Sequence, residues 1–125
     1  MNKLAIQLAE ERTAFRPREV LRGAAEWELV QAPAAVEVRL CWFAQVQGVS
    51  EVRVVETVRY DRPLGTDRRN FDFRLPEAPY SYAGPLAMLS WAVELVTLPD
   101  KEFTQVFFTM GPGGEVIELQ RQLET

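Results

Sequence analysis

The chain has 125 residues, 47% of them hydrophobic, and a net charge of −4. This composition is typical of one folded domain and excludes wholesale disorder, and the acidic balance argues against nucleic acid as the main partner. Histidine is absent, which removes the commonest general base and metal ligand, and the single cysteine, Cys41, excludes a disulfide within the chain.

Apolar and polar residues alternate with a period of two through the first half of the chain, which predicts strands that each bury one face. The alternation is clearest in "VEVRLCWFAQVQ" (residues 36–47), where Trp42 falls on the inward face while Cys41 and Phe43 fall on the outward face. Two earlier segments follow the same rule, namely "KLAIQL" (residues 3–8) and "VLRGAAEWEL" (residues 20–29).

The next predicted strand, "SEVRVVETVRY" (residues 50–60), breaks the alternation once. Val52 and Val54 share an inward face with later apolar residues, but Glu56 falls on that face too. A charged residue there indicates a β-bulge, a change of sheet or an exposed strand end. The segment "NFDFRL" (residues 70–75) is regular again and buries two phenylalanines and a leucine.

A proline-rich segment, "LPEAPYSYAGP" (residues 75–85), separates these strands from the rest. Its prolines fix φ and donate no backbone hydrogen bond, so the segment cannot join the middle of a sheet. We predict a rigid loop that crosses the end of a sandwich. Tyr80 and Tyr82 would cover the end of the core with their hydroxyls in water.

The segment "AMLSWAVELV" (residues 87–96) contains helix formers, but apolar residues on both sides favour a strand that is buried on one face and partly covered on the other. Trp91 falls on its buried face. We predict that Trp91 and Trp42 are both buried and lie close together across the sandwich.

The last strands carry apolar residues on both faces. In "EFTQVFFTM" (residues 102–110), Phe103 and Phe107 fall on the outward face. The segment "GPGG" (residues 111–114) predicts a hairpin turn, and "EVIEL" (residues 115–119) predicts a final strand. Together the segments make about eight short strands at roughly ten-residue spacing, which is typical of a sandwich or barrel.

Two motifs carry a family resemblance. The proline loop and the strand after it resemble the arrestin-like superfamily, including bacterial sporulation-control-type proteins. A second segment, "RPREVLRGAAEWEL", is similar to the family's entry into its second strand, with Arg18 in place of the usual glycine, so the turn is expected to differ. The matching residues are Pro76, Pro79, Ser81, Tyr82, Gly84 and Trp91, and then Pro17, Glu19, Val20 and Gly23.

The resemblance covers about residues 1 to 110. It implies an all-β, immunoglobulin-like β-sandwich of arrestin type, with about eight antiparallel strands in a single domain over residues 1–125. Arrestins have two such sandwiches in tandem and this chain has room for one, so the polar core and gating elements of arrestins are not carried over.

Candidate catalytic groups are few. The aspartates, which could form a glycosidase-type pair or a hard-metal site, are isolated in turns or on outward positions, and we interpret them as solvated charges. Cys41 has no histidine to activate it, and Ser81 has no base, so we interpret them as an inert thiol and a turn serine that bonds its own backbone. We expect no enzyme activity, no cofactor and no bound metal.

Interaction is the function that the residues and the resemblance favour. We predict a non-enzymatic protein-interaction or scaffold domain; the alternatives are a small-molecule or lipid-binding β-sandwich rimmed by Tyr80 and Tyr82, and an enzyme that uses only carboxylates and arginine. The arginines could bind anions such as a phosphorylated tail, or could be solvated loop charges. The candidate interaction residues are Arg16, Arg18, Arg22, Arg68, Arg69, Phe43, Tyr80 and Tyr82.

The outward apolar residues predict a covered surface. A homodimer is one explanation, and folding of residues 111–125 over the same surface is the other. No continuous apolar run marks a signal peptide or a membrane span, so we expect a cytoplasmic protein that is not integral to a membrane.

Overall fold

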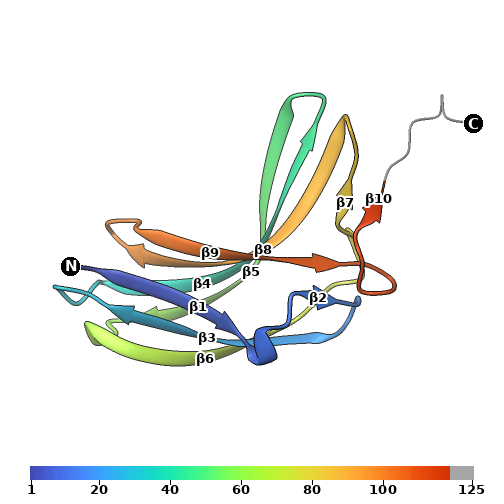
Figure 1. The fold of residues 1–125 in the computed structure, drawn as a ribbon. Helices are drawn as coiled ribbons and strands as arrows, with labels where there is room; N and C mark the ends of the chain where they lie inside the picture. Colours follow the sequence, from blue (N-terminus) through green and yellow to red (C-terminus); the bar gives the residue numbers. More distant parts are fainter. Residues whose placement is uncertain (119–125) are drawn as a thin grey trace, which may run out of the picture.

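The computed structural model describes residues 1–118, and these form a two-sheet β-sandwich (Figure 1). The strands that the alternation predicts are all present, the last of them over two residues only, and two further strands of two residues each raise the number to ten among the described residues. The strands are β1 (Lys3–Leu8), β2 (Ala14–Phe15), β3 (Val20–Glu28), β4 (Ala35–Val46), β5 (Val49–Asp61), β6 (Thr66–Arg74), β7 (Tyr82–Ala83), β8 (Ala87–Leu98), β9 (Phe103–Met110) and β10 (Ile117–Glu118).

The smaller sheet has the order β1-β3-β6, and the larger sheet has the order β10-β7-β8-β4-β5, with β9 also pairing with β8. The long strands pair antiparallel, while β2–β9 and β10–β7 are parallel. The predicted hairpin at "GPGG" is therefore wrong. The chain turns there, with the N–H of Gly114 donating to the oxygen of Gly111 (3.0 Å), and then runs beside β7 instead of returning along β9.

The core lies between the sheets, and its largest side chains come from the predicted inward positions. Trp27, Phe73 and Leu21 of the smaller sheet are fully buried, as are Leu40 and Leu95 of the larger sheet. Their burial is the main source of stability, since each large apolar side chain contributes on the order of 2 kcal/mol.

A glycine on β3 permits close packing of the smaller sheet. A Cβ at Gly23 would lie 2.7 Å from the ring of Phe71 and 2.7 Å from the backbone oxygen of Gln7. Real Cβ atoms do not approach other atoms so closely. Phe71 therefore packs onto the backbone of β3 only because residue 23 has no side chain.

The two tryptophans do not meet across the sandwich, contrary to the prediction. Trp42 on β4 and Trp91 on β8 are register partners in the same sheet. Trp91 is fully buried and its Nε1 donates to the backbone oxygen of Pro79 (2.8 Å), whereas Trp42 is only half-buried. Both face inward as predicted, but periodicity gives the face of a residue and not the sheet that it joins.

The bulge indicated by Glu56 is confirmed. Leu40 pairs with Glu56 and Cys41 pairs with Val54, so Val55 has no partner on β4. An extra residue in a strand moves the side chains of all preceding residues of that strand to the opposite face. Val52 therefore shares the outer face with Val54, and the prediction that these valines face inward is wrong.

Part of the larger sheet projects beyond the smaller one. Figure 1 shows the β4–β5 hairpin and the first part of β8 rising away from the rest of the sandwich. We call residues 42–54 and 87–90 the wing. The remainder of the larger sheet, which the smaller sheet covers, is the closed part.

The proline-rich loop carries the chain from β6 in the smaller sheet to β8 in the larger sheet, as predicted. The prediction that no part of it joins the middle of a sheet is wrong, because its two residues without proline, Tyr82 and Ala83, form β7 between β10 and β8. Tyr80 and Tyr82 are half-buried and pack against the core. Ser81 is buried, and its Oγ accepts a hydrogen bond from the N–H of Met110 (2.9 Å). This serine thus fastens the loop to β9 and does not bond its own backbone as expected.

Candidate functional site

A strip of apolar side chains crosses the outer face of the larger sheet. The strand register places Phe107, Ala92, Cys41 and Val54 in one row, and Phe43 stands opposite Val52 in the adjacent part of the face. Phe107, Val52 and Val54 are 53%, 61% and 48% exposed. The ring centroids of Phe43 and Phe107 are 6.1 Å apart. We call these six residues the outer strip.

The middle of the outer strip is closely packed. Cys41 and Ala92 are buried, and the Sγ of Cys41 donates to the backbone oxygen of Ala92 (3.6 Å). Burial, with a further contribution from the negative charge of Glu94, raises the pKa of the Cys41 thiol to about 12. The thiol is therefore protonated at neutral pH and is a poor nucleophile, as expected from the sequence.

Charged residues border the outer strip toward the closed part. Glu37 accepts hydrogen bonds from Arg39 (2.6 Å) and Arg59 (2.9 Å), and Arg59 also binds Asp61 (2.7 Å). Burial alone would raise the pKa of Glu37, but the hydrogen bonds from the two arginines outweigh it and hold the pKa below its ordinary value. An apolar centre with a charged border is typical of protein interfaces.

A groove of about 270 Å³ continues the outer strip on its other side. It lies where β9 leaves β8 and β7 takes its place. Phe107 of β9 lines the groove together with Met88 and Ser90 of β8. Ala83 of β7 and Val116, which precedes β10, complete the lining. The outer strip therefore ends in a recess that could receive a side chain.

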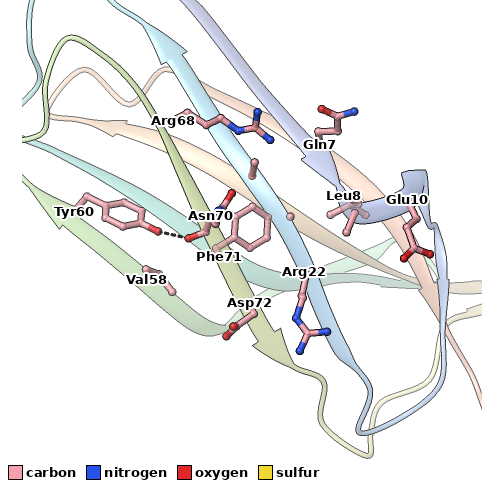
Figure 2. A pocket seen from close by; sticks show the side chains of 13 residues that line it. Gln7, Leu8, Glu10, Arg22, Val58, Tyr60, Arg68, Asn70, Phe71 and Asp72 are labelled. Carbon is pink, nitrogen blue, oxygen red and sulfur yellow. Dashed lines mark hydrogen bonds between the residues drawn. The ribbon is translucent and has the colours of Figure 1, made fainter.

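A second surface lies on the smaller sheet and beside β5 of the larger sheet. A groove of about 640 Å³ is lined by Arg22, Arg68, Asn70 and Asp72, together with Glu10 (Figure 2). Figure 2 shows Glu10 and Asp72 on different sides of Arg22, so the two carboxylates do not converge as a glycosidase pair would require. Leu8, Val58, Tyr60 and Phe71 also line the groove, so its wall is both polar and apolar.

The structure does not gather the candidate arginines into one anion site. Only Arg22 and Arg68 share a groove, and Arg68 also lies 3.5 Å from Glu26. Arg69 binds Asp67 (2.9 Å), while Arg16 is exposed in the turn before β3 and its backbone N–H donates to Glu19 (2.6 Å).

Arg18 forms an ion pair with Glu77 of the proline-rich loop. Its φ is 69°, a left-handed conformation that glycine adopts without strain. Residue 18 therefore keeps a glycine-like backbone although the sequence led us to expect a different turn.

Two residues of the outer strip, Val52 and Val54, were missed as outward residues. Glu56 was the signal that could have placed them, because a bulge beside it reverses the faces of the preceding residues. Phe43 and Phe107 were expected on the outer face and lie there. Of the segment that might have capped them, residues 117–118 pair with β7, and residues 119–125 lie outside the described residues.

No protein-family model matches the sequence, and no curated protein matches it. Among solved structures, Spo0M, a sporulation control protein from Bacillus subtilis, superposes with a TM-score of 0.65 at 15% sequence identity. The match covers 87% of this chain and 49% of the Spo0M chain, so this chain spans about half of that protein's length. The arrestin-like β-sandwich fold predicted from the motifs is thereby confirmed.

Two features of the described residues bear on other functions. Residues 1–118 contain no group of three acidic, cysteine or histidine side chains placed to hold one metal ion. In the same part of the chain, no helix has the length and hydropathy needed to cross a membrane.

Proposed function

We propose that this arrestin-like sandwich, taken as one domain over residues 1–125, is a non-enzymatic interaction domain that binds a protein partner through the outer strip. The observation that supports the proposal most strongly is an apolar strip bordered by ion pairs, in which Phe107, Val52 and Val54 are exposed on either side of a closely packed middle. Contiguous apolar patches rimmed by polar groups mark interaction sites on soluble proteins.

The inventory of reactive groups supports a role without catalysis. The chain has no histidine, and the thiol of Cys41 is buried and protonated. Glu37 and Asp67 are held by arginines, which lower the pKa of both carboxyl groups. No activated nucleophile or paired acid and base follows from these groups.

A protein is the partner class that the charge distribution favours. The net charge of −4 opposes binding to nucleic acid. A lipid or small-molecule site inside the sandwich is less well supported, because Trp27, Trp91 and Phe73 fill the core. We place the protein in the cytoplasm and propose that one of its partners is a second copy of itself.

The test is affinity capture by the full chain, with two matched variants on β9. Phe107 belongs to the outer strip, whereas Phe103 is similarly exposed (59%) on the same face but lies outside the strip. We expect Phe107→Glu to lose the proteins that the wild type retains, and Phe103→Glu to retain them. Equal sets of proteins from both variants would contradict the proposed surface.

A further inference from the structure

Strand β5 forms one edge of the larger sheet, and among residues 1–118 no strand pairs with its outward side. Open edges can pair with other chains, and proteins limit this with lysine and other charges, proline, bulges or a covering segment. The 13 residues of β5 include neither lysine nor proline. This edge is therefore a natural site for strand addition.

The bulge at Val55 divides the edge into two parts. After the bulge, β6 approaches β5: the hydroxyl of Tyr60 donates to the backbone oxygen of Asn70 (3.4 Å), and Arg69 lies over the Tyr60 ring at 5.2 Å. Before the bulge, residues 49–54 belong to the wing and are all exposed. The free part of the edge is thus a regular stretch of six residues.

The hairpin turn sets the direction of the backbone groups in this stretch. Gln47 and Gly48 both have positive φ (49° and 84°), as in a two-residue turn of type I′. Val46 pairs with Val49 across this turn, and the pair that closes such a turn is hydrogen-bonded.

Bonded and non-bonded pairs then alternate along the ladder. Val49, Glu51 and Arg53 direct their N–H and C=O groups toward β4. Ser50 and Val54, with Val52 between them, therefore direct theirs toward the free edge. Three consecutive outward-directed residues are enough to bond a second strand.

We propose that two copies of this chain pair antiparallel along residues 49–54, about a two-fold axis through Val52, so that the larger sheet continues from one copy into the other. In this register Glu51 of each copy stands directly opposite Arg53 of the other. An axis through Glu51 or through Arg53 would instead place like charges opposite each other, which destabilises a sheet.

The side chains on both faces fit this arrangement. Glu51 and Arg53 are 3.3 Å apart within one chain, and their side chains are 57% and 63% exposed, so each is free to meet its counterpart. On the outer face Val52 meets Val52, which joins the two outer strips into one surface. The inference rests on the proposed function in that the joined surface would bind the partner.

Charge reversal tests the register with the full chain. Glu51→Arg and Arg53→Glu each place two like-charge pairs at the axis, and we expect each to raise the dimer dissociation constant by about tenfold or more. Mixed in equal amounts, the two variants restore both opposite-charge pairs and should form a heterodimer. The double variant E51R/R53E should dimerise like the wild type.

The molar mass of each sample is measured by light scattering over a wide range of protein concentration. A monomer has a mass of 14.3 kDa. Arg53 lies over the Trp42 ring at 5.8 Å, so thermal unfolding of each variant serves as the folding control. A monomeric wild type at every concentration overturns the inference. So does a mixture of the two single variants that stays monomeric while both are folded.

Cysteine substitution tests the axis independently. Antiparallel partners have Cα atoms about 5.5 Å apart, within the range for a disulfide. Under a mild oxidant, Val52→Cys copies should crosslink, whereas Ser50→Cys copies, held apart by the register, should not. Equal crosslinking of both variants would overturn the register.

Failure of this inference can be told from failure of the proposed function. If the charge variants dimerise like the wild type but Phe107→Glu is monomeric, the copies meet through the outer strip and not through the edge. If Phe107→Glu dimerises through the edge yet captures the same proteins as the wild type, the proposed function fails and the edge pairing stands.

Discussion

The closed part of the larger sheet and its wing are made from the same strands, yet the two parts differ in how their faces and edges are covered. In the closed part, β4 and β8 are covered by the smaller sheet, and an ion-pair network covers the outer face. In the wing the same strands carry a half-buried tryptophan and an open edge. The difference shows that alternation places residues on faces, but the partner sheet decides whether a face is a core or a surface.

The largest expected difference between the two parts lies in their tryptophans. Trp91→Ala removes a fully buried ring and the hydrogen bond to Pro79, and should lower the free energy of unfolding by about 3–5 kcal/mol. Trp42→Ala removes a half-buried ring and should cost about 1–2 kcal/mol. Urea unfolding of both variants measures these changes in the free energy of unfolding. Equal decreases for the two variants would contradict the distinction between the closed part and the wing.

Two glycines give a smaller contrast. In Gly23→Ala the new methyl group meets the Phe71 ring, and overpacking of this kind costs about 1–3 kcal/mol. Gly48→Ala has no atom within 4 Å of the new methyl group, and its cost of about 1 kcal/mol comes only from the positive φ of 84°. Thermal unfolding of the pair should rank Gly23→Ala as the less stable variant; the reverse order would mean that the packing at β3 is looser than the structure has it.

The ion-pair network of the closed part predicts a pH dependence. Because the folded protein holds the pKa of Glu37 below 4.5, the ionised carboxylate stabilises the fold above that pH, and the contribution is lost as the pH falls through the folded value. Glu37→Gln should therefore lose less stability than the wild type on acidification below pH 4.5. Parallel curves of unfolding free energy against pH for the two proteins would count against this role.

The smallest expected effect is on the reaction rate of the Cys41 thiol, which belongs to the outer strip. With a pKa of about 12 and almost no exposure, Cys41 should react with a disulfide reagent at neutral pH only slowly, and rapidly after unfolding. Phe107→Ala should uncover the thiol and increase the rate in the folded protein, while Phe103→Ala should not. Fast labelling of the folded wild type would show that the other residues of the outer strip do not shield Cys41.

The sequence was sufficient to predict the long strands, because in each of them apolar and polar residues alternate and turn residues mark both ends. The motif around Pro79 and Trp91 was sufficient to predict the arrestin-like fold. The sheet to which each strand belongs could not be predicted in this way. The alternation places Trp42 and Trp91 on inward faces whether their strands are neighbours in one sheet or face each other across the core, so their pairing within one sheet depends on long-range register.

The outer strip could be predicted only in part for a related reason. Phe43 and Phe107 follow from alternation, but Val52 and Val54 depend on where the extra residue of a bulge lies. Glu56 reveals that a bulge exists without giving its position. The groove beside Arg22 and Asp72 also escaped prediction, because these two residues come from strands that only the folded sheet brings together.

Amide hydrogen exchange, measured residue by residue at low and high protein concentration, tests most directly whether the wing is where this domain contacts other proteins. We expect Val52 and Val54 to exchange more slowly as the concentration rises, because their N–H groups gain partners. Glu51 and Arg53, whose N–H groups already face β4, should change little. Exchange at Val52 and Val54 that is fast and independent of concentration would show that the copies do not pair along this edge.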